Sequence, residues 1–116
     1  MSPDEIVQSR KILREITDTT DITVLPTLAF ASLRFLPRLS GIYFCLGHGQ
    51  SVLYIGLARN LRSRWYDHHR FAELMWHQCQ HIAWLTAPIS LLQSLERRFI
   101  VRYQPLLQTG PQKRQR

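Results

Sequence analysis

The order of hydrophobic and polar residues at the start of the chain predicts a helix. Ser2-Pro3-Asp4-Glu5 places a capping serine, a proline in the first turn and a glutamate three residues after the cap, which is typical of a helix start. The apolar side of this helix is formed by Ile6, Val7, Leu13 and Ile16. The polar run after Ile16 ends the pattern, so the sequence predicts a helix over residues 3–17.

The pattern then becomes irregular before two short apolar runs. Residues 22–25 read as a short strand, and the prolines that follow predict mostly loop over 26–40, with room for one short helix. Residues 41–46 and 52–56 are both apolar and are separated by a glycine-containing turn. They predict an antiparallel hairpin.

The second half alternates between helical and strand patterns. The predicted elements are a helix over 61–69, a short helix over 71–78, a strand over 81–86 and a helix over 89–103. Together with the hairpin they predict an α+β fold: a small three-stranded antiparallel sheet flanked by helices, with an extra N-terminal helix. Residues 1–39 would form an N-terminal extension, 40–108 the main domain, and 109–116 a basic disordered tail.

Composition is that of a folded protein outside the membrane. Of the 116 residues 45% are hydrophobic, and no apolar run approaches the roughly 18 residues that span a bilayer. The N-terminus lacks the basic-then-apolar pattern of a signal peptide, and Cys45 and Cys79 have no metal-type spacing. We therefore expect a cytoplasmic protein with free thiols and no membrane partner.

The positive charge is concentrated in the second part of the chain. Residues 1–40 hold five acidic and five basic side chains, whereas residues 41–116 hold three acidic and ten basic ones, which accounts for the net charge of +7. Nearly all of this excess is arginine, which binds phosphate through a planar, bidentate guanidinium. A nucleic acid is the expected partner, and solubilising charge on a small basic protein is the alternative.

Several polar residues stand where chemistry could use them. Tyr43 and Tyr54 lie in the two strands of the hairpin, and Arg64 and His68 are four residues apart, so they would share one side of a helix. The alternative for that helix is an ordinary amphipathic segment with a solvated basic side.

Glu96 lies within the apolar stripe of the last predicted helix, four residues from both Leu92 and Ile100. A buried carboxylate needs a compensating cation, either a divalent metal ion or an arginine. The alternative is that Glu96 sits at the edge of the stripe and pairs with a surface arginine.

In this order the motifs resemble those of the GIY-YIG nuclease superfamily over roughly residues 40–108. The residues that carry the resemblance are Tyr43 of Gly41-Ile42-Tyr43, Tyr54 and Gly56 of Tyr54-Ile55-Gly56, then Arg64, His68 and Glu96. The last polar position of the family, normally asparagine after a proline, aligns with Gln108 of Pro105-Leu106-Leu107-Gln108. Glutamine keeps the amide and moves it outward by one methylene.

The resemblance implies a metal-dependent endonuclease that hydrolyses phosphodiester bonds in DNA. It implies that Glu96 holds one Mg²⁺ or another divalent cation such as Mn²⁺, and that Arg64 stabilises charge on the scissile phosphate. Tyr43 would help to activate the attacking water while Tyr54 and His68 position or share the proton; which group is the base stays open. The basic residues expected to contact the nucleic acid are Arg59, Arg62, Arg64 and Arg70.

Two other functions stay open at this stage. One is a catalytically impaired nucleic-acid-binding module on the same scaffold, and the other is a protein-interaction domain with incidental basic charge. Sequence specificity is equally open: a weakly specific enzyme, a homodimer or a partner subunit would each be consistent with the chain.

Overall fold

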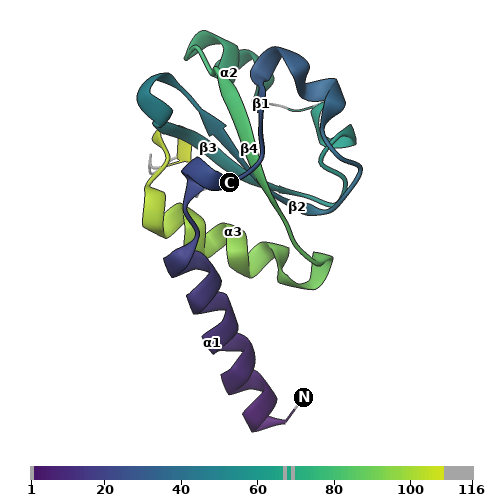
Figure 1. Ribbon diagram of the computed structural model, residues 1–116, viewed down its shortest axis with the longest axis vertical. Helices are drawn as coiled ribbons and strands as arrows, with labels where there is room; N and C mark the ends of the chain where they lie inside the picture. Colours follow the sequence, from purple (N-terminus) through teal and green to yellow (C-terminus); the bar gives the residue numbers. More distant parts are fainter. Residues whose placement is uncertain (1, 67, 69, 109–116) are drawn as a thin grey trace.

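A computed structural model describes residues 2–66, 68 and 70–108 (Figure 1). Its centre is one antiparallel sheet in which the strands lie in the order β1-β4-β2-β3. The strands are β1 (Thr27–Ala29), β2 (Gly41–Leu46), β3 (Val52–Ala58) and β4 (His81–Thr86). The sheet therefore has four strands, and the predicted number of three is wrong.

The additional strand lies in the segment that the sequence assigned to loop. β1 spans only three residues and pairs with β4, with Leu28 opposite Ile82. The strand expected at residues 22–25 is wrong, because Ile22–Val24 forms a 3₁₀ turn. The side chain of Asp21 explains the difference: its Oδ1 accepts a hydrogen bond from the Thr23 backbone N–H at 2.9 Å, which favours a turn over an extended chain.

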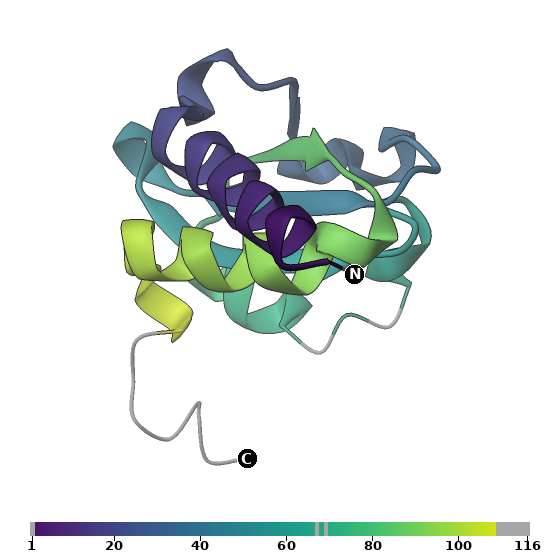
Figure 2. The same cartoon turned by 90° about the horizontal axis from the view of Figure 1, so that it is seen from below.

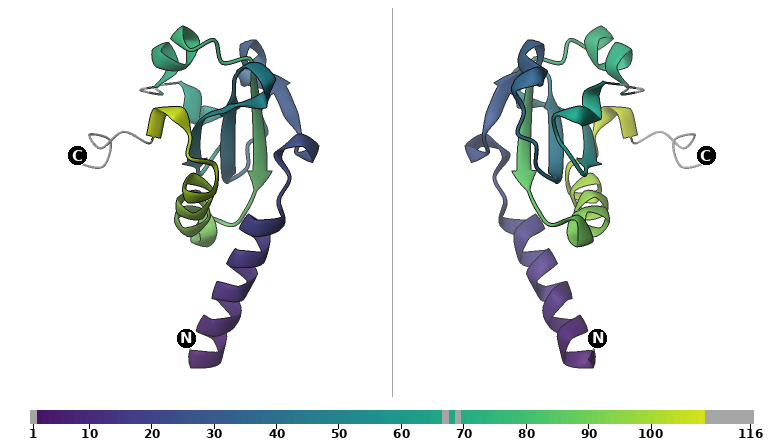
Figure 3. Two further views of the ribbon diagram at one scale, coloured as in Figure 1. Left: turned by 90° about the vertical axis from the view of Figure 1, so that its left-hand side faces the viewer. Right: turned by 90° about the vertical axis from the view of Figure 1, so that its right-hand side faces the viewer.

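The sheet separates two hydrophobic cores because side chains alternate along each strand. Ile42 and Phe44 point to the side covered by α3 (Ile89–Tyr103), which packs along β3 and β2 (Figure 3). Tyr43 and Cys45 point to the other side, where α2 (Phe71–Trp76) contributes the buried Leu74. Among the described residues, no helix combines the length and the apolar composition needed to cross a membrane.

The helix predicted over 61–69 is wrong in its described part. Residues Ser63–Trp65 form a single 3₁₀ turn, η4, and residues 67 and 69 lie outside the described part of the chain. Asn60 starts the turn, since its Oδ1 accepts from the backbone N–H groups of Arg62 (3.1 Å) and Ser63 (3.2 Å). Leu61 and Trp65 are buried and hold the turn against the sheet.

The N-terminal helix α1 (Pro3–Thr19) extends away from the rest of the structure, and its last turns lie beside α3 (Figures 1 and 2). The predicted capping box at Ser2 is present, with the Glu5 N–H donating to Ser2 Oγ at 3.2 Å. At the other end, the terminal carbonyl groups need donors from elsewhere, because the last turn of α1 contains no basic residue.

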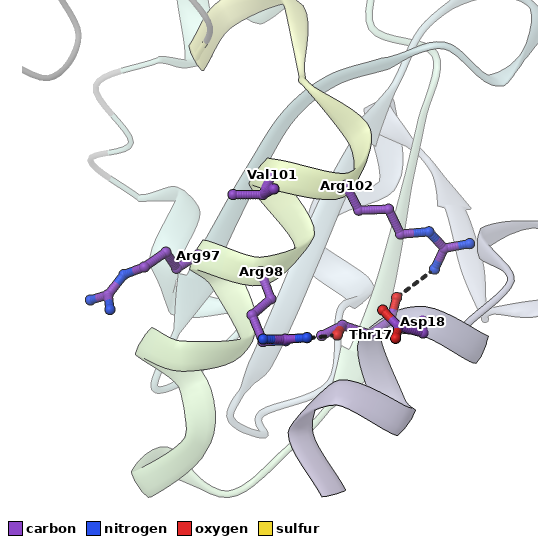
Figure 4. Close-up of a pocket in the computed structure, with 6 residues that line it drawn as sticks. All are labelled: Thr17, Asp18, Arg97, Arg98, Val101 and Arg102. Atoms are coloured by element: carbon purple, nitrogen blue, oxygen red, sulfur yellow. Dashed lines mark hydrogen bonds between the residues drawn. The ribbon is translucent and has the colours of Figure 1, made fainter. Parts of the chain in front are cut away.

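Two arginines of α3 supply those donors. Arg102 donates to the backbone oxygens of Thr17 and Thr20, each at 2.7 Å, and Arg98 Nε donates to Thr17 Oγ1 at 3.0 Å. They line a cavity of about 460 Å³ between the helices, in which the Arg97 side chain points away from α1 (Figure 4). Asp18 also lines this cavity. We therefore interpret the cavity as part of the contact between α1 and α3.

Arg102→Ala should loosen α1 without affecting the sheet. The loss of two charge-assisted hydrogen bonds at a solvent-exposed position should cost about 1 kcal/mol, and amides of residues 3–19 should exchange roughly fivefold faster. Hydrogen exchange by mass spectrometry measures this, with Arg97→Ala as the matched control. Equal exchange in α1 for the two variants would contradict this role of Arg102.

Candidate active site

Tyr43 occupies the centre of the site, and its position depends on a glycine in the neighbouring strand. Tyr43 is fully buried in β2 and lies directly opposite Gly56 in β3. A Cβ atom at position 56 would overlap the phenol ring and hydroxyl of Tyr43. Glycine is therefore required at position 56 for steric reasons, because the Tyr43 ring occupies the space that any side chain there would need.

The hydroxyl of Tyr43 is held by His68. Tyr43 Oη and His68 Nε2 are 2.5 Å apart, and the backbone N–H of Arg70 donates to His68 Nδ1 at 3.0 Å. Because Nδ1 accepts a hydrogen bond, the hydrogen-bond pattern assigns the proton of the neutral imidazole to Nε2. His68 therefore donates to Tyr43, which leaves the hydroxyl proton of Tyr43 directed elsewhere.

Aromatic rings fix the orientation of this pair. Trp65 stacks on His68 with ring centroids 4.1 Å apart and an angle of 13° between the planes, and it meets Tyr43 edge-on at 5.1 Å. Tyr54 lies on the same side of the sheet, with its ring centroid 6.2 Å from that of Tyr43. No sequence motif marks Trp65 as a residue of the site, because its stacking on His68 depends on the geometry of the turn.

The surroundings favour the neutral form of both tyrosines. Burial raises the pKa of Tyr43 above its usual range, Tyr54 raises it further, and the positive charge of Arg64 lowers it. Burial also raises the pKa of Tyr54, whereas the guanidinium of Arg70, 5.4 Å from the ring centroid, lowers it. An ionised Tyr43 therefore depends on Arg64 and on the hydrogen bond from His68.

Glu96 lies on the other side of the sheet, and its charge acts on both tyrosines. It is half-buried on α3; burial raises the pKa of its carboxyl, and a hydrogen bond from the Leu57 backbone, Arg64 and Arg97 lower it. The same carboxylate raises the pKa values of Tyr43 and Tyr54. Since Leu57 belongs to the edge strand β3, the carboxylate of Glu96 lies near the outer edge of the sheet, and its charge acts from there on the tyrosines.

The carboxylate of Glu96 fits a largely hydrated magnesium ion. Within the described ranges, no group of three or more His, Cys, Asp or Glu side chains is placed to hold a metal. Mg²⁺ is usually bound by one or two carboxylates and keeps several water ligands, so a single half-buried carboxylate at a sheet edge suits it. Zinc sites use three or four protein ligands, and the described residues around Glu96 do not supply that number.

Gln108 holds the backbone of β3. Its Oε1 accepts from the Ile55 N–H at 2.8 Å, and its Nε2 donates to the Ile55 carbonyl at 2.5 Å. The side-chain amide therefore pairs with the free edge of the sheet as another strand would. Because Ile55 lies between Tyr54 and Gly56, Gln108 positions the strand that carries them.

The predicted nucleic-acid contacts lie in different environments. Arg64 is half-buried and its charge acts on Tyr43, Tyr54 and Glu96, as described above. Arg62 is partly buried and donates from Nε to the Leu36 carbonyl at 2.7 Å, while Arg59 is exposed just after β3. Arg70 forms an ion pair with Glu73 at 2.5 Å, so its charge is already partly compensated.

Comparison with known proteins identifies the fold. No family model and no curated protein matches the chain. Crystal structures of the GIY-YIG N-terminal endonuclease domain of UvrC from Thermotoga maritima match it with a TM-score of 0.56 and 17–18% identity, covering 66% of this chain and 90–91% of that domain. The chain has the GIY-YIG fold.

The resemblance predicted from sequence is thereby confirmed at the level of the fold. The matched structures include the magnesium-bound domain and two point mutants bound to the catalytic divalent cation. The motif residues of this chain lie in two adjacent strands: Tyr43 is in β2, and Tyr54 and Gly56 are in β3. The α+β class and the flanking helices agree with the prediction, apart from the number of strands.

Gln108→Leu should destabilise the domain because it leaves the N–H and C=O of Ile55 unpaired in a part-buried position. The expected loss is about 1–3 kcal/mol in the free energy of unfolding, measured by urea denaturation. Gln93→Leu, at an exposed position of α3, is the control. The same small change in both variants would contradict the proposed role of Gln108.

Glu96→Gln should stabilise the domain near neutral pH. Burial raises the pKa of this carboxyl above its ordinary value of 4.5, so the folded state keeps the proton to higher pH than the unfolded chain does. Stability therefore falls as pH rises from that value, and the glutamine variant escapes the loss. Thermal unfolding should show a higher Tm for Glu96→Gln at neutral pH and no difference below about pH 4.

The control for this measurement is Glu73→Gln, which removes a carboxylate that is paired with Arg70. It should bring no gain in Tm at neutral pH. A Tm difference between Glu96→Gln and the unmodified chain that does not depend on pH would contradict the account of Glu96.

Proposed function

We propose that this chain is a metal-dependent endonuclease that hydrolyses phosphodiester bonds in DNA. The observation that supports it most is the 2.5 Å contact between Tyr43 and His68, at a tyrosine whose pKa responds to both Arg64 and Glu96. The buried hydroxyl of Tyr43 is thus influenced by a cation and an anion and accepts a hydrogen bond from His68, and packing alone would need none of these groups. They are the groups that phosphoryl transfer to water uses.

In the proposed reaction, ionised Tyr43 accepts a proton from the attacking water. The water oxygen forms the new bond to phosphorus, the bond to the leaving oxygen breaks, and the leaving oxygen takes a proton from solvent. Holding a tyrosine with a pKa near 10 ionised at neutral pH costs about 4 kcal/mol, and burial adds to this. The His68 Nε2–H and the charge of Arg64 both favour the ionised form and offset that cost.

Other residues are proposed to act on the scissile phosphate and on the rest of the nucleic-acid backbone. Arg64 stabilises the negative charge that develops on the phosphate oxygens. Glu96 would hold one Mg²⁺ or Mn²⁺ ion, which when bound supplies Lewis-acid stabilisation of the same charge. Arg59 and Arg62 are proposed to contact neighbouring phosphates, and Arg70 to contribute positive charge while its backbone N–H orients His68.

A catalytically impaired nucleic-acid-binding module is the second candidate. The raised pKa of Tyr43 favours it, since burial opposes the ionised form that the reaction needs. Nicking of supercoiled plasmid with Mg²⁺, compared with the same reaction in chelator, separates the two candidates. Salt-sensitive, metal-independent binding without nicking would support the binding module.

Tyr43→Phe and Glu96→Ala should each abolish magnesium-dependent nicking while the fold is kept. The loss of a base or of the metal ligand should lower the rate by about 10²-fold to 10⁴-fold. Plasmid nicking measures the rate, circular dichroism checks the fold, and Gln93→Ala on the exposed side of α3 is the control. Retained nicking by either site variant would disprove the assignment.

A further inference from the structure

A small cavity lies beside η4, and its lining does not include Trp65, the residue of the turn that packs on Tyr43. It has a volume of about 220 Å³ and is lined by Arg38, Asn60, Arg62, Ser63 and Tyr66. None of these five residues carries a carboxyl group. We infer that this cavity binds an unstacked nucleotide next to the scissile phosphate, an inference that rests on the proposed nuclease function.

Two guanidinium groups make the cavity suitable for a phosphate. Arg62 is held by the bond from its Nε to the Leu36 carbonyl at 2.7 Å, which leaves the two terminal nitrogens as its remaining donors. Arg38 adds a second guanidinium to the lining. Fixing one arginine in advance lowers the entropy lost when a phosphate binds, and guanidinium groups can donate in pairs to the two non-bridging oxygens of a phosphodiester.

The polar side chains between them are also fixed. Asn60 Oδ1 is occupied by the backbone N–H groups of Arg62 and Ser63, so the remaining hydrogen-bonding group of its side chain is the NH₂ donor. Ser63 Oγ donates to the Asn60 carbonyl at 3.4 Å, so its proton is already used. The donors left for a phosphate or sugar oxygen are the Asn60 NH₂ group and the arginines.

Tyr66 supplies a feature that a phosphate site alone does not need. Its side chain is 77% exposed, whereas the adjacent Trp65 is 9% exposed and faces His68. An exposed aromatic ring beside arginines is a platform on which a base can stack. A base within an intact duplex already has both of its faces stacked, so the ring favours a nucleotide that is unpaired or turned out of the helix.

The size and place of the cavity suit this arrangement. Its volume is below the roughly 300–1,000 Å³ of pockets that enclose a drug-sized ligand, so the phosphate would lie inside and the base over the open ring. Arg62 directly precedes η4 and Arg64 lies within it, and the charge of Arg64 acts on Tyr43. The nucleotide in the cavity would therefore be a neighbour of the one that is cleaved.

The experiment measures binding in chelator, so that cleavage does not interfere. Fluorescence anisotropy compares labelled oligo(dT) with a duplex of the same length, for the unmodified chain, Tyr66→Ala and Tyr66→Phe. Tyr66→Ala should weaken single-strand binding by about tenfold and leave duplex binding unchanged, while Tyr66→Phe should keep both. A fluorescent aminopurine in the single strand should be quenched by the unmodified chain and by Tyr66→Phe but not by Tyr66→Ala.

Equal weakening of single-strand and duplex binding in Tyr66→Ala, or no weakening of either, would overturn the inference. So would quenching that persists in Tyr66→Ala. The nicking assay is read separately: a Tyr66 effect on binding in a chain that does not nick would support the nucleotide site and refute the nuclease. Nicking that depends on Glu96, without an effect of Tyr66→Ala on binding, would support the nuclease and refute the nucleotide site.

Discussion

The packing of Tyr43 on Gly56 is the constraint on which the rest of the site depends. The ring of Tyr43 lies directly over the opposite strand, which only a glycine allows, and this brings its hydroxyl to His68. The same placement buries the hydroxyl and raises its pKa, so its reactivity depends on the neighbouring His68 and Arg64. One cross-strand contact therefore sets the position, the hydrogen bonding and the acidity of the central group.

The free edge of β3 has both a structural and a functional role. An edge strand exposes backbone N–H and C=O groups that must find partners. Gln108 pairs with both groups of Ile55, and the backbone of Leu57, two residues further along the same edge, lowers the pKa of the Glu96 carboxyl. The edge that Gln108 covers thus also lies beside the carboxylate whose charge acts on the tyrosines. This costs stability, because Glu96 is held half-buried.

Much of this could be predicted from the sequence because it depends on local pattern. The hairpin, α3 and the unusual place of Glu96 in an apolar stripe follow from periodicity. β1 could not be predicted because three residues beside Pro26 form a strand only by pairing with β4. The expected helix that would align Arg64 with His68 is a short turn in its described part, and tertiary packing on Trp65 orients His68 instead. The role of Gln108 depends on a contact 53 residues away in sequence, which no local pattern contains.

We propose that a divalent cation held by Glu96 at the edge of β3 lies close to the tyrosines and His68 on the other side of the sheet. Paramagnetic broadening by Mn²⁺ tests it most directly, in NMR spectra of the chain with isotope-labelled tyrosine and histidine. Broadening concentrated on Tyr43, Tyr54 and His68, and lost in Glu96→Gln, is the predicted result. Broadening that spares these rings, or that is unchanged in Glu96→Gln, would contradict the account.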